Sequence, residues 1–475
     1  MLRILSVLKS QKKAAISSLA LLASLSMNAQ CSLTGYKNLS QGESFTVALK
    51  DNGSLWLWGY NNFGLSGNGT GQYTQIQHPW EMSEVGGGWT EVQAGENYIV
   101  ALKANGDLYG WGGNNYGQLG TGNNTNQFSP KLIMQNVKAY SVGLLHTVVI
   151  KNDGTMWGTG YNDWGGLGIG SSVGFVNVWT RESTNATNWK SLGTGLYNTY
   201  GVKTDGTLWA TGANLYGQAG LPQASGNETD DFKQIGTDTN WSVVYGGEFH
   251  AVGLKTNGEL YTWGGNPHGQ VGLGATTGTT YYTPQKMSGS NWSSISAGRL
   301  SSFATKTDGT LWGWGDNNNG KIGSGSATAT VNTPTMVGAT GWKTIPYRVG
   351  YYSSAAIDNA GSVYTWGWDG YWQLGNDDGT QTNSNVPSKV SCSDLGVDEI
   401  TSGKKVSLYP NPAKDIVTLQ SAKAISEVKI YSATGSIVKS ISKVSDNKIN
   451  VSDLPAGVYI VKINDVAEGV KLIKK

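Results

Sequence analysis

The fold is decided by a 26-residue stretch that recurs along the chain, seen most fully as GEFHAVGLKTNGELYTWGGNPHGQVG at residues 247–272. Its internal glycines fall 11, 17, 22 and 25 residues after Gly247. The same spacing starts again at six other glycines: Gly42, Gly95, Gly143, Gly195, Gly298 and Gly350. Seven copies follow one another at intervals of 48 to 53 residues, and one lattice position, Trp372, is not glycine. The chain is therefore a repeat protein over most of its length.

Each copy has the pattern of a β-hairpin with further short strands around it. Apolar runs such as AVGLK and ELYTWG flank an Asn-Gly or Asp-Gly pair in six copies. Such a pair predicts a tight hairpin turn with positive φ at both positions. The seventh copy has Ala360-Gly361 instead, so a different turn is expected there. Four short strands cannot bury their own faces, which predicts an all-β fold, a seven-bladed β-propeller over residues 30–395.

Composition and charge exclude several classes of protein. The 475 residues include 68 Gly and 19 Trp but only 14% charged residues, and so many aromatic residues are untypical of a disordered chain. The net charge of +2 divides into +4 in residues 1–29, +6 in residues 404–475 and −8 between them. Because binding to nucleic acid requires a basic surface, the acidic middle argues against nucleic acid as a partner.

The first 29 residues predict a secretory signal peptide. Basic residues up to Lys13 precede an apolar run over residues 14–27, which is too short to span a bilayer. Cys31 follows Gln30 rather than a small residue, which disfavours lipidation. The mature chain is therefore expected outside the cytoplasm, with no transmembrane segment.

The glycine lattice resembles the regulator-of-chromosome-condensation repeat over about residues 33–392, through its hairpin and its Gly-Gln-Leu-Gly ending. The resemblance implies a seven-bladed propeller, in a family with nuclear exchange factors, a plant ultraviolet receptor and secreted bacterial members. The family often has His three residues after the first Gly of a copy, and here only His146 and His250 are present. The Gly-Trp-Arg-His-Thr blocks of the ultraviolet receptor are absent. A secreted chain does not meet a nuclear GTPase, so neither photoreception nor nucleotide exchange is expected.

After a linker at 396–403, residues 404–475 contain no Trp and alternate in short β-like runs, which predicts a small β-sandwich. The segment resembles the type A sorting domain of type IX secretion. The residues that carry the likeness are Tyr409, Pro410, Asn411, Pro412, Gly457, Tyr459, Lys474 and Lys475. The resemblance implies export from the periplasm by the type IX machinery, to the medium or to the outer-membrane surface. A self-standing adhesive domain is the alternative.

The two positions after the first Gly of each copy vary freely and are expected to ring one end of the propeller axis. We predict a binding rim there that consists of Glu43, Tyr197, Phe249, Arg299, Tyr351 and Tyr352. Three aromatic residues in loops are further candidates: Trp164, Trp368 and Trp372. Free variation on an exposed rim is the alternative explanation. The residues just before the 22-offset glycine, among them Phe63, Tyr116 and Tyr371, are expected to pack the blades.

Catalysis has little support in the sequence. The four His have no metal-type spacing, and no P-loop or Gly-x-Ser-x-Gly elbow is present, so no catalytic residue, metal or cofactor is expected. Cys31 and Cys392 bracket the propeller, whose first and last blades are neighbours, which predicts a disulfide in an oxidising compartment. We therefore expect a propeller that binds a protein or glycan. The alternative is a hydrolase or lyase with its site in the channel.

Overall fold

The computed structural model describes residues 34–274, 278–339, 341–376 and 380–391 of the N-terminal part. In the C-terminal part it describes residues 407–409, 411–420, 425–432, 436–442, 444, 447–463 and 470–475. They belong to two compact units, of which one lies within Gln30–Cys392 and the other contains Ser393–Lys475. Within the described residues, no helix has the length and apolar character needed to cross a membrane.

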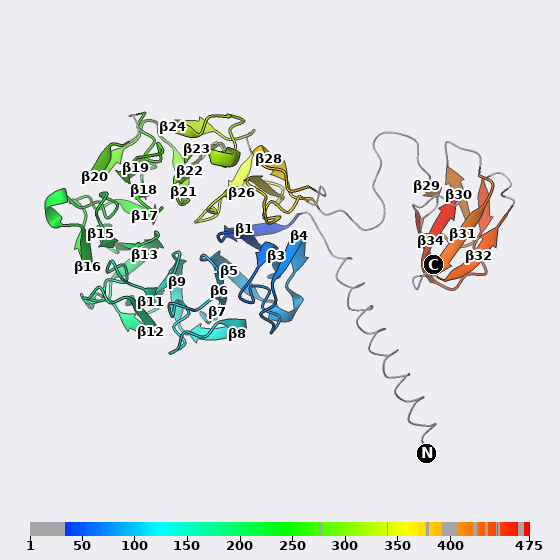
Figure 1. Cartoon of the computed structure of the whole chain (residues 1–475), viewed down its shortest axis with the longest axis horizontal. Coiled ribbons are helices and arrows are strands. Elements are labelled where there is room, and N and C mark those ends of the chain that lie inside the picture. The colour runs from blue at the N-terminus through cyan, green and yellow to red at the C-terminus, as the bar shows by residue number, and fades with distance from the viewer. Residues whose placement is uncertain are drawn as a thin grey trace, which may run out of the picture. The chain divides into compact units, whose positions relative to one another are not determined.

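The larger unit is a ring of seven antiparallel four-stranded meanders, each formed by one continuous stretch of chain (Figure 1). This confirms the predicted seven-bladed propeller. Blades 1 to 4 are β1 (Tyr36–Gln41), β2 (Phe45–Lys50), β3 (Leu55–Asn61) and β4 (Thr74–Glu81); β5 (Trp89–Ala94), β6 (Tyr98–Lys103), β7 (Leu108–Gly112) and β8 (Gln127–Met134); β9 (Val137–Val142), β10 (His146–Lys151), β11 (Met156–Tyr161) and β12 (Phe175–Arg181); β13 (Trp189–Thr194), β14 (Asn198–Lys203), β15 (Leu208–Ala213) and β16 (Glu228–Gln234). Blades 5 to 7 are β17 (Trp241–Gly246), β18 (His250–Lys255), β19 (Leu260–Gly265) and β20 (Thr280–Lys286); β21 (Trp292–Ala297), β22 (Ser301–Lys306), β23 (Leu311–Asp316) and β24 (Thr330–Met336); β25 (Trp342–Thr344), β26 (Ser353–Asp358), β27 (Val363–Gly367) and β28 (Ser384–Lys389). Three short 3-10 helices lie in the loops: η1 (Ser83–Val85), η2 (Gln223–Ser225) and η3 (Asn318–Gly320).

The hairpin turns differ from the predicted type. Only the glycine has positive φ, as at Gly53 with φ 81°, while Asn52 before it does not. The amide of Gly53 donates to the carbonyl of Lys50 at 2.9 Å, and that of Lys50 to the carbonyl of Ser54 at 3.0 Å. This is a three-residue loop with a glycine bulge. Gly361, with φ 77°, makes the same turn in blade 7, so the expectation of a different turn there was wrong.

Tryptophans join neighbouring blades from inside the ring. In five blades an indole N–H donates to a backbone carbonyl of the preceding blade, at 2.8 to 3.0 Å. These residues are Trp58, Trp111, Trp263, Trp314 and Trp366, and all five side chains are fully buried. A buried indole must find a hydrogen-bond partner, and here the partner fixes the angle between blades.

Blade 7 closes directly onto blade 1. The amide of Tyr36 donates to the carbonyl of Gly361 at 3.0 Å. The side-chain amide of Gln41 donates to Ser353 Oγ at 3.2 Å and accepts from the amide of Gly350 at 3.1 Å. The two ends of the repeat region therefore meet, as the disulfide prediction requires. Cys31 and Cys392 themselves lie outside the described residues, so the bond stays a prediction, as does the signal peptide.

The smaller unit is a sandwich of two antiparallel sheets, as predicted. One sheet has the order β29 (Ser407–Tyr409), β30 (Ile416–Gln420) and β33 (Lys448–Asn450), and the other β32 (Ile437–Ile441), β31 (Val428–Ser432), β34 (Gly457–Ile463) and β35 (Val470–Lys474). The first and last pieces of the sorting motif lie together. The amide of Ile473 donates to Asn411 Oδ1, and that of Lys475 to the carbonyl of Ala413. Pro410 lies outside the described residues.

Candidate functional site: the aromatic face at the seam of blades 7 and 1

The predicted rim positions do gather at one end of the blades. The third residue of each copy pairs with the 17-offset glycine, as in Phe45↔Gly59 and Ser353↔Gly367. The loop before the second strand and the loop after the third strand therefore share one edge of each blade. Neighbouring rim loops are hydrogen-bonded: the amide of Glu43 donates to the carbonyl of Glu96 at 3.1 Å, and that of Glu96 to Leu144 at 3.0 Å.

At the seam between blades 7 and 1 this edge carries a continuous row of aromatic rings, here called the seam arc. It consists of Tyr351, Tyr352, Trp368, Tyr371 and Tyr60. Successive ring centroids lie 4.1, 4.9, 5.4 and 4.8 Å apart. All five side chains are half-buried. The arc thus offers aromatic surface that is held in place but still reaches solvent.

Two glycines make room for the arc. Gly367 has φ 105°, and a Cβ there would lie 2.6 Å from the carbonyl oxygen of Tyr352. Gly370 lies under the indole of Trp368, because a Cβ at that position would lie 2.1 Å from Trp368 Cζ2. Only glycine permits so close an approach.

A cavity of about 190 Å³ lies against the seam arc. Four arc rings line it, those of Tyr60, Tyr352, Trp368 and Tyr371, together with the carboxylate-bearing Glu43. Tyr352 and Trp368 meet edge to face with an interplanar angle of 63°, and Trp368 and Tyr371 with one of 85°. The cavity walls are therefore rings set at steep angles to one another.

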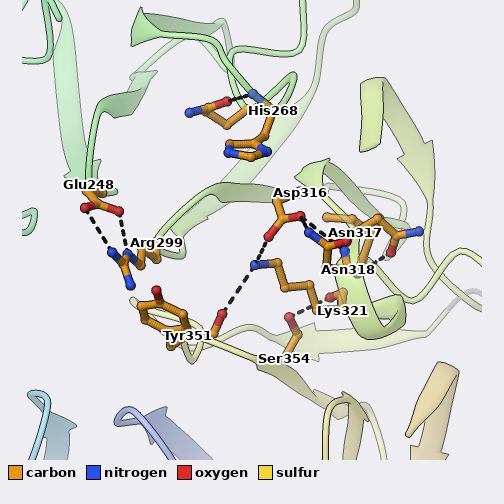
Figure 2. A network of polar contacts seen from close by, with 11 residues as sticks. Glu248, His268, Arg299, Asp316, Asn317, Asn318, Lys321, Tyr351 and Ser354 are labelled. Carbon is orange, nitrogen blue, oxygen red and sulfur yellow. Dashed lines mark hydrogen bonds and ion pairs between the residues drawn. The ribbon is translucent and has the colours of Figure 1, made fainter. Parts of the chain in front are cut away.

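An ion pair extends the arc into blades 5 and 6. Arg299 binds both carboxylate oxygens of Glu248, with Nη2 3.1 Å from Oε1. Its guanidinium carbon also lies 3.9 Å from the ring centroid of Tyr351. Figure 2 shows Arg299 between Glu248 and Tyr351. The end of the arc is thus already capped by a cation held over an aromatic face.

A buried lysine holds the backbone of the arc (Figure 2). Lys321 Nζ lies 2.5 Å from Asp316 Oδ2 and donates to the carbonyl of Tyr351 at 3.3 Å. Ser354 Oγ donates to the carbonyl of Lys321 at 2.8 Å. Burial lowers the pKa of Lys321, and the charge of Asp316 opposes that shift. Lys321 therefore positions the tyrosine pair through the main chain.

The channel is occupied by an insertion that the sequence analysis did not notice. The interval from the inner-strand Trp to the next lattice glycine is 6 residues at Trp292 but 8 at Trp342. The strand ends early, and the extra residues include Tyr347, whose ring lies 5.6 Å from that of Tyr245, and Arg348. Two cavities beside Arg348 are about 10 Å³ each, room for about one water molecule.

The acidic residues near the channel influence one another. Burial raises the pKa of Glu96, and the neighbouring charge of Glu43 raises it further, while Arg348 and Arg299 oppose both effects. Within the described residues, Arg348 Nη1 is buried and has no hydrogen-bond partner. The described residues also contain no cluster of His, Cys, Asp and Glu that would hold a metal ion.

The remaining predicted residues lie apart from the seam arc. Tyr197 and Trp164 form another cluster with Tyr161, with ring centroids 6.3 and 5.9 Å from that of Tyr197. Phe249 packs on Tyr216 at 4.9 Å. Trp372 does not line the cavity and, within the described part of the chain, contacts no other aromatic ring. The structure thus brings together Glu43, Arg299, Tyr351, Tyr352 and Trp368 of the predicted residues.

Tyr60 and Tyr371 belong to the site but were not predicted in it. Tyr371 was expected only to pack the blades, and it also lines the cavity. A usable signal was the position 18 residues after the first Gly. It is a large aromatic residue at Tyr60, Tyr161 and Trp368, and Gly, Ala or Asp in the other four copies.

Residues 20–349 match the model of the RCC1-like domain, which is more than half of the chain. The chain belongs to the RCC1-like domain family. Residues 360–408 also match the Regulator of chromosome condensation (RCC1) repeat, and residues 407–475 the Secretion system C-terminal sorting domain. These matches confirm both resemblances. The sorting domain marks this RCC1-like propeller as a secreted or cell-surface protein of the type IX system.

The chain is 27% identical to the Ultraviolet-B receptor UVR8 of Arabidopsis thaliana over 369 residues, 76% of this chain and 82% of that protein. It is 26% identical to the E3 ubiquitin-protein ligase HERC2 of Homo sapiens over 306 residues, 63% of this chain but only 5% of that protein. Prp20p of Saccharomyces cerevisiae superposes with a TM-score of 0.63 at 18% identity, over 73% of this chain and 88% of the other. Human WBSCR16 gives a TM-score of 0.60 at 19% identity, over 73% and 96%. The two solved structures support the propeller fold alone.

Proposed function

We propose that this secreted propeller is a binding protein that takes an extracellular protein partner on the face that carries the seam arc. The observation that supports it is the arc itself, five half-buried aromatic rings in contact, ended by the Arg299–Glu248 pair. Tyr, Trp and Arg are the residues that dominate binding energy at protein interfaces. The T-shaped packing of Trp368 with its neighbours favours a protein over a flat stack of sugar rings, which would require an uncovered ring face.

The lining of the cavities supports binding over catalysis. The large cavity at the seam has four arc rings and the single carboxylate of Glu43 among its lining residues. The cavities beside Arg348 in the channel leave room for about one water molecule each. A hydrolase or lyase would require a substrate-sized space with paired acid and base groups.

Capture with matched variants tests the proposal. The mature full chain, immobilised, is exposed to extracellular proteins and to a glycan array, beside Trp368→Ala and the control Phe175→Ala. Phe175 is an exposed aromatic residue on the outermost strand β12 of another blade. We expect one protein retained by the wild type and the control but lost with Trp368→Ala. Retention of glycans alone, retention that Trp368→Ala does not change, or turnover of a bound polymer would overturn the proposal.

A further inference from the structure

We infer that the cavity on the seam arc is an aromatic cage with one carboxylate, which takes an alkylammonium group. This inference rests on the proposed function, because it names the group by which a partner would be anchored. Three features carry it: the arrangement of the rings, the carboxylate of Glu43, and the use of the same interaction elsewhere in this fold.

The rings present the right surface. The face of an aromatic ring carries a partial negative charge, and a cation within about 6 Å of a ring centroid is attracted to it. Trp368 stands at steep angles to Tyr352 on one side and Tyr371 on the other, so the three rings form walls of one cavity. A volume of about 190 Å³ is about six times the share of one water molecule in the liquid. That is enough for an ammonium nitrogen with its methyl or methylene groups.

The carboxylate selects a cation over other ligands. Glu43 lines the cavity and, within the described residues, its carboxylate has no hydrogen bond or ion pair. An anion would meet the charges of Glu43 and the nearby Glu96, whose pKa Glu43 raises after burial. A neutral apolar group would desolvate the Glu43 carboxylate without compensation, which is costly. An alkylammonium group offers both a charge for Glu43 and apolar carbon for the rings.

The propeller already uses this interaction at the end of the arc and inside its blades. Arg299 lies over Tyr351 at 3.9 Å. Lys50 lies 3.7 Å from the ring centroid of Trp56, and Lys203 3.6 Å from that of Trp209. In the seam cavity the rings and the carboxylate are present without a lysine of the chain's own.

Calorimetry on the mature full chain with choline tests the cage. The matched probe is 3,3-dimethylbutan-1-ol, which has the shape of choline with carbon in place of the charged nitrogen. We expect choline to bind and the neutral alcohol to bind at least tenfold more weakly. Trp368→Ala and Glu43→Gln should each weaken choline binding at least tenfold, whereas Trp368→Phe, which keeps a ring face, should stay within a few-fold. Trp164→Ala, the same change in the Tyr161–Tyr197 cluster, should have no effect.

A second arm identifies the source of the ammonium group. Short peptides that contain lysine, trimethyl-lysine or norleucine at one position are titrated in the same way. Tighter binding of the lysine or trimethyl-lysine peptide than of choline supports a protein partner, and the reverse supports a free quaternary amine. Equal binding of choline and the neutral alcohol, or no binding of any cation, overturns the cage. If a protein is captured through Trp368 while no cation binds, the proposed function stands and the cage falls.

Discussion

Two buried histidines should make the propeller sensitive to mild acid. His146 Nε2 lies 3.4 Å from Thr199 Oγ1, and His250 Nε2 2.8 Å from Ser302 Oγ, so each imidazole contacts the next blade. Burial lowers the pKa of His146 to about 4, with a further contribution from the charge of Arg348. Burial likewise lowers the pKa of His250 to about 3. Both side chains are therefore neutral in the folded protein at pH values where an unfolded chain already protonates them.

The sign and size of the effect follow from proton linkage. An unfolded histidine titrates near pH 6.5, so below that pH the unfolded chain binds protons that the folded chain does not. The free energy of unfolding therefore falls as the pH falls from about 6.5, by up to about 1.4 kcal/mol per pH unit for each histidine. For His146 the loss is complete near pH 4, and for His250 near pH 3. Between pH 6.5 and pH 4 each histidine removes about 3 kcal/mol.

The repeat supplies the variants. Asn198 and Ser301 occupy the same position in other blades, so His146→Asn and His250→Ser introduce residues that this position already accepts. Urea unfolding is followed by tryptophan fluorescence, which reports on the propeller because all 19 Trp lie between residues 56 and 372. From pH 6.5 to pH 4 the wild type should lose about 6 kcal/mol more than the double variant.

The comparison cancels other titrating groups, because both proteins carry the same carboxylates. The control is Asn198→Ser, a change at the same blade position that removes no titrating group and should keep the wild-type pH dependence. A double variant whose stability falls with pH as steeply as that of the wild type would refute the assignment of the acid sensitivity to these histidines.

Three further changes test how the arc is held. Lys321→Met should destabilise the propeller by about 3 kcal/mol in urea unfolding, because it leaves the Asp316 carboxylate buried without its cation; the double variant Asp316→Gly/Lys321→Gln should stay within about 1 kcal/mol of wild type, and equal losses would contradict the ion-pair explanation. Trp372→Gly should stabilise the fold by about 1 kcal/mol in the same assay, because Trp372 has φ 63° where the other copies have glycine; a loss of stability would show that its side chain contributes more than the strain. Gly370→Ala should weaken choline binding at least tenfold in calorimetry without removing the indole of Trp368, since the added carbon would displace it; unchanged affinity would place the ligand elsewhere.

Much of the fold could be predicted because the glycine lattice encodes it locally. A backbone that must take positive φ or approach a neighbour closely excludes side chains, so the lattice marks the turns in every copy. The turn type was missed because Asn-Gly is compatible with two loop lengths, and only the hydrogen bond from Gly53 to Lys50 distinguishes them. The departure at Ala360 proved irrelevant, because the turn depends on Gly361 alone.

The site was only partly predictable, for a physical reason. The free variation of rim residues pointed to the right edge of the blades and to Tyr352 and Trp368. Which rings share a cavity depends on contacts between blades that are far apart in the sequence, such as Tyr60 against Tyr371. The inserted Arg348 was overlooked because a two-residue insertion leaves the lattice glycines of its copy in register.

The position of the cage at the seam has an energetic consequence. Its rings come from both ends of the repeat region, Tyr60 from blade 1 and Trp368 from blade 7. The same seam is held by hydrogen bonds such as that between Gln41 and Ser353. A ligand that touches both blades binds the closed ring and not an opened one, so it stabilises closure by mass action, by about 2.7 kcal/mol at one hundred times its dissociation constant. Recognition and ring closure are therefore one equilibrium in this propeller, and either is a measure of the other.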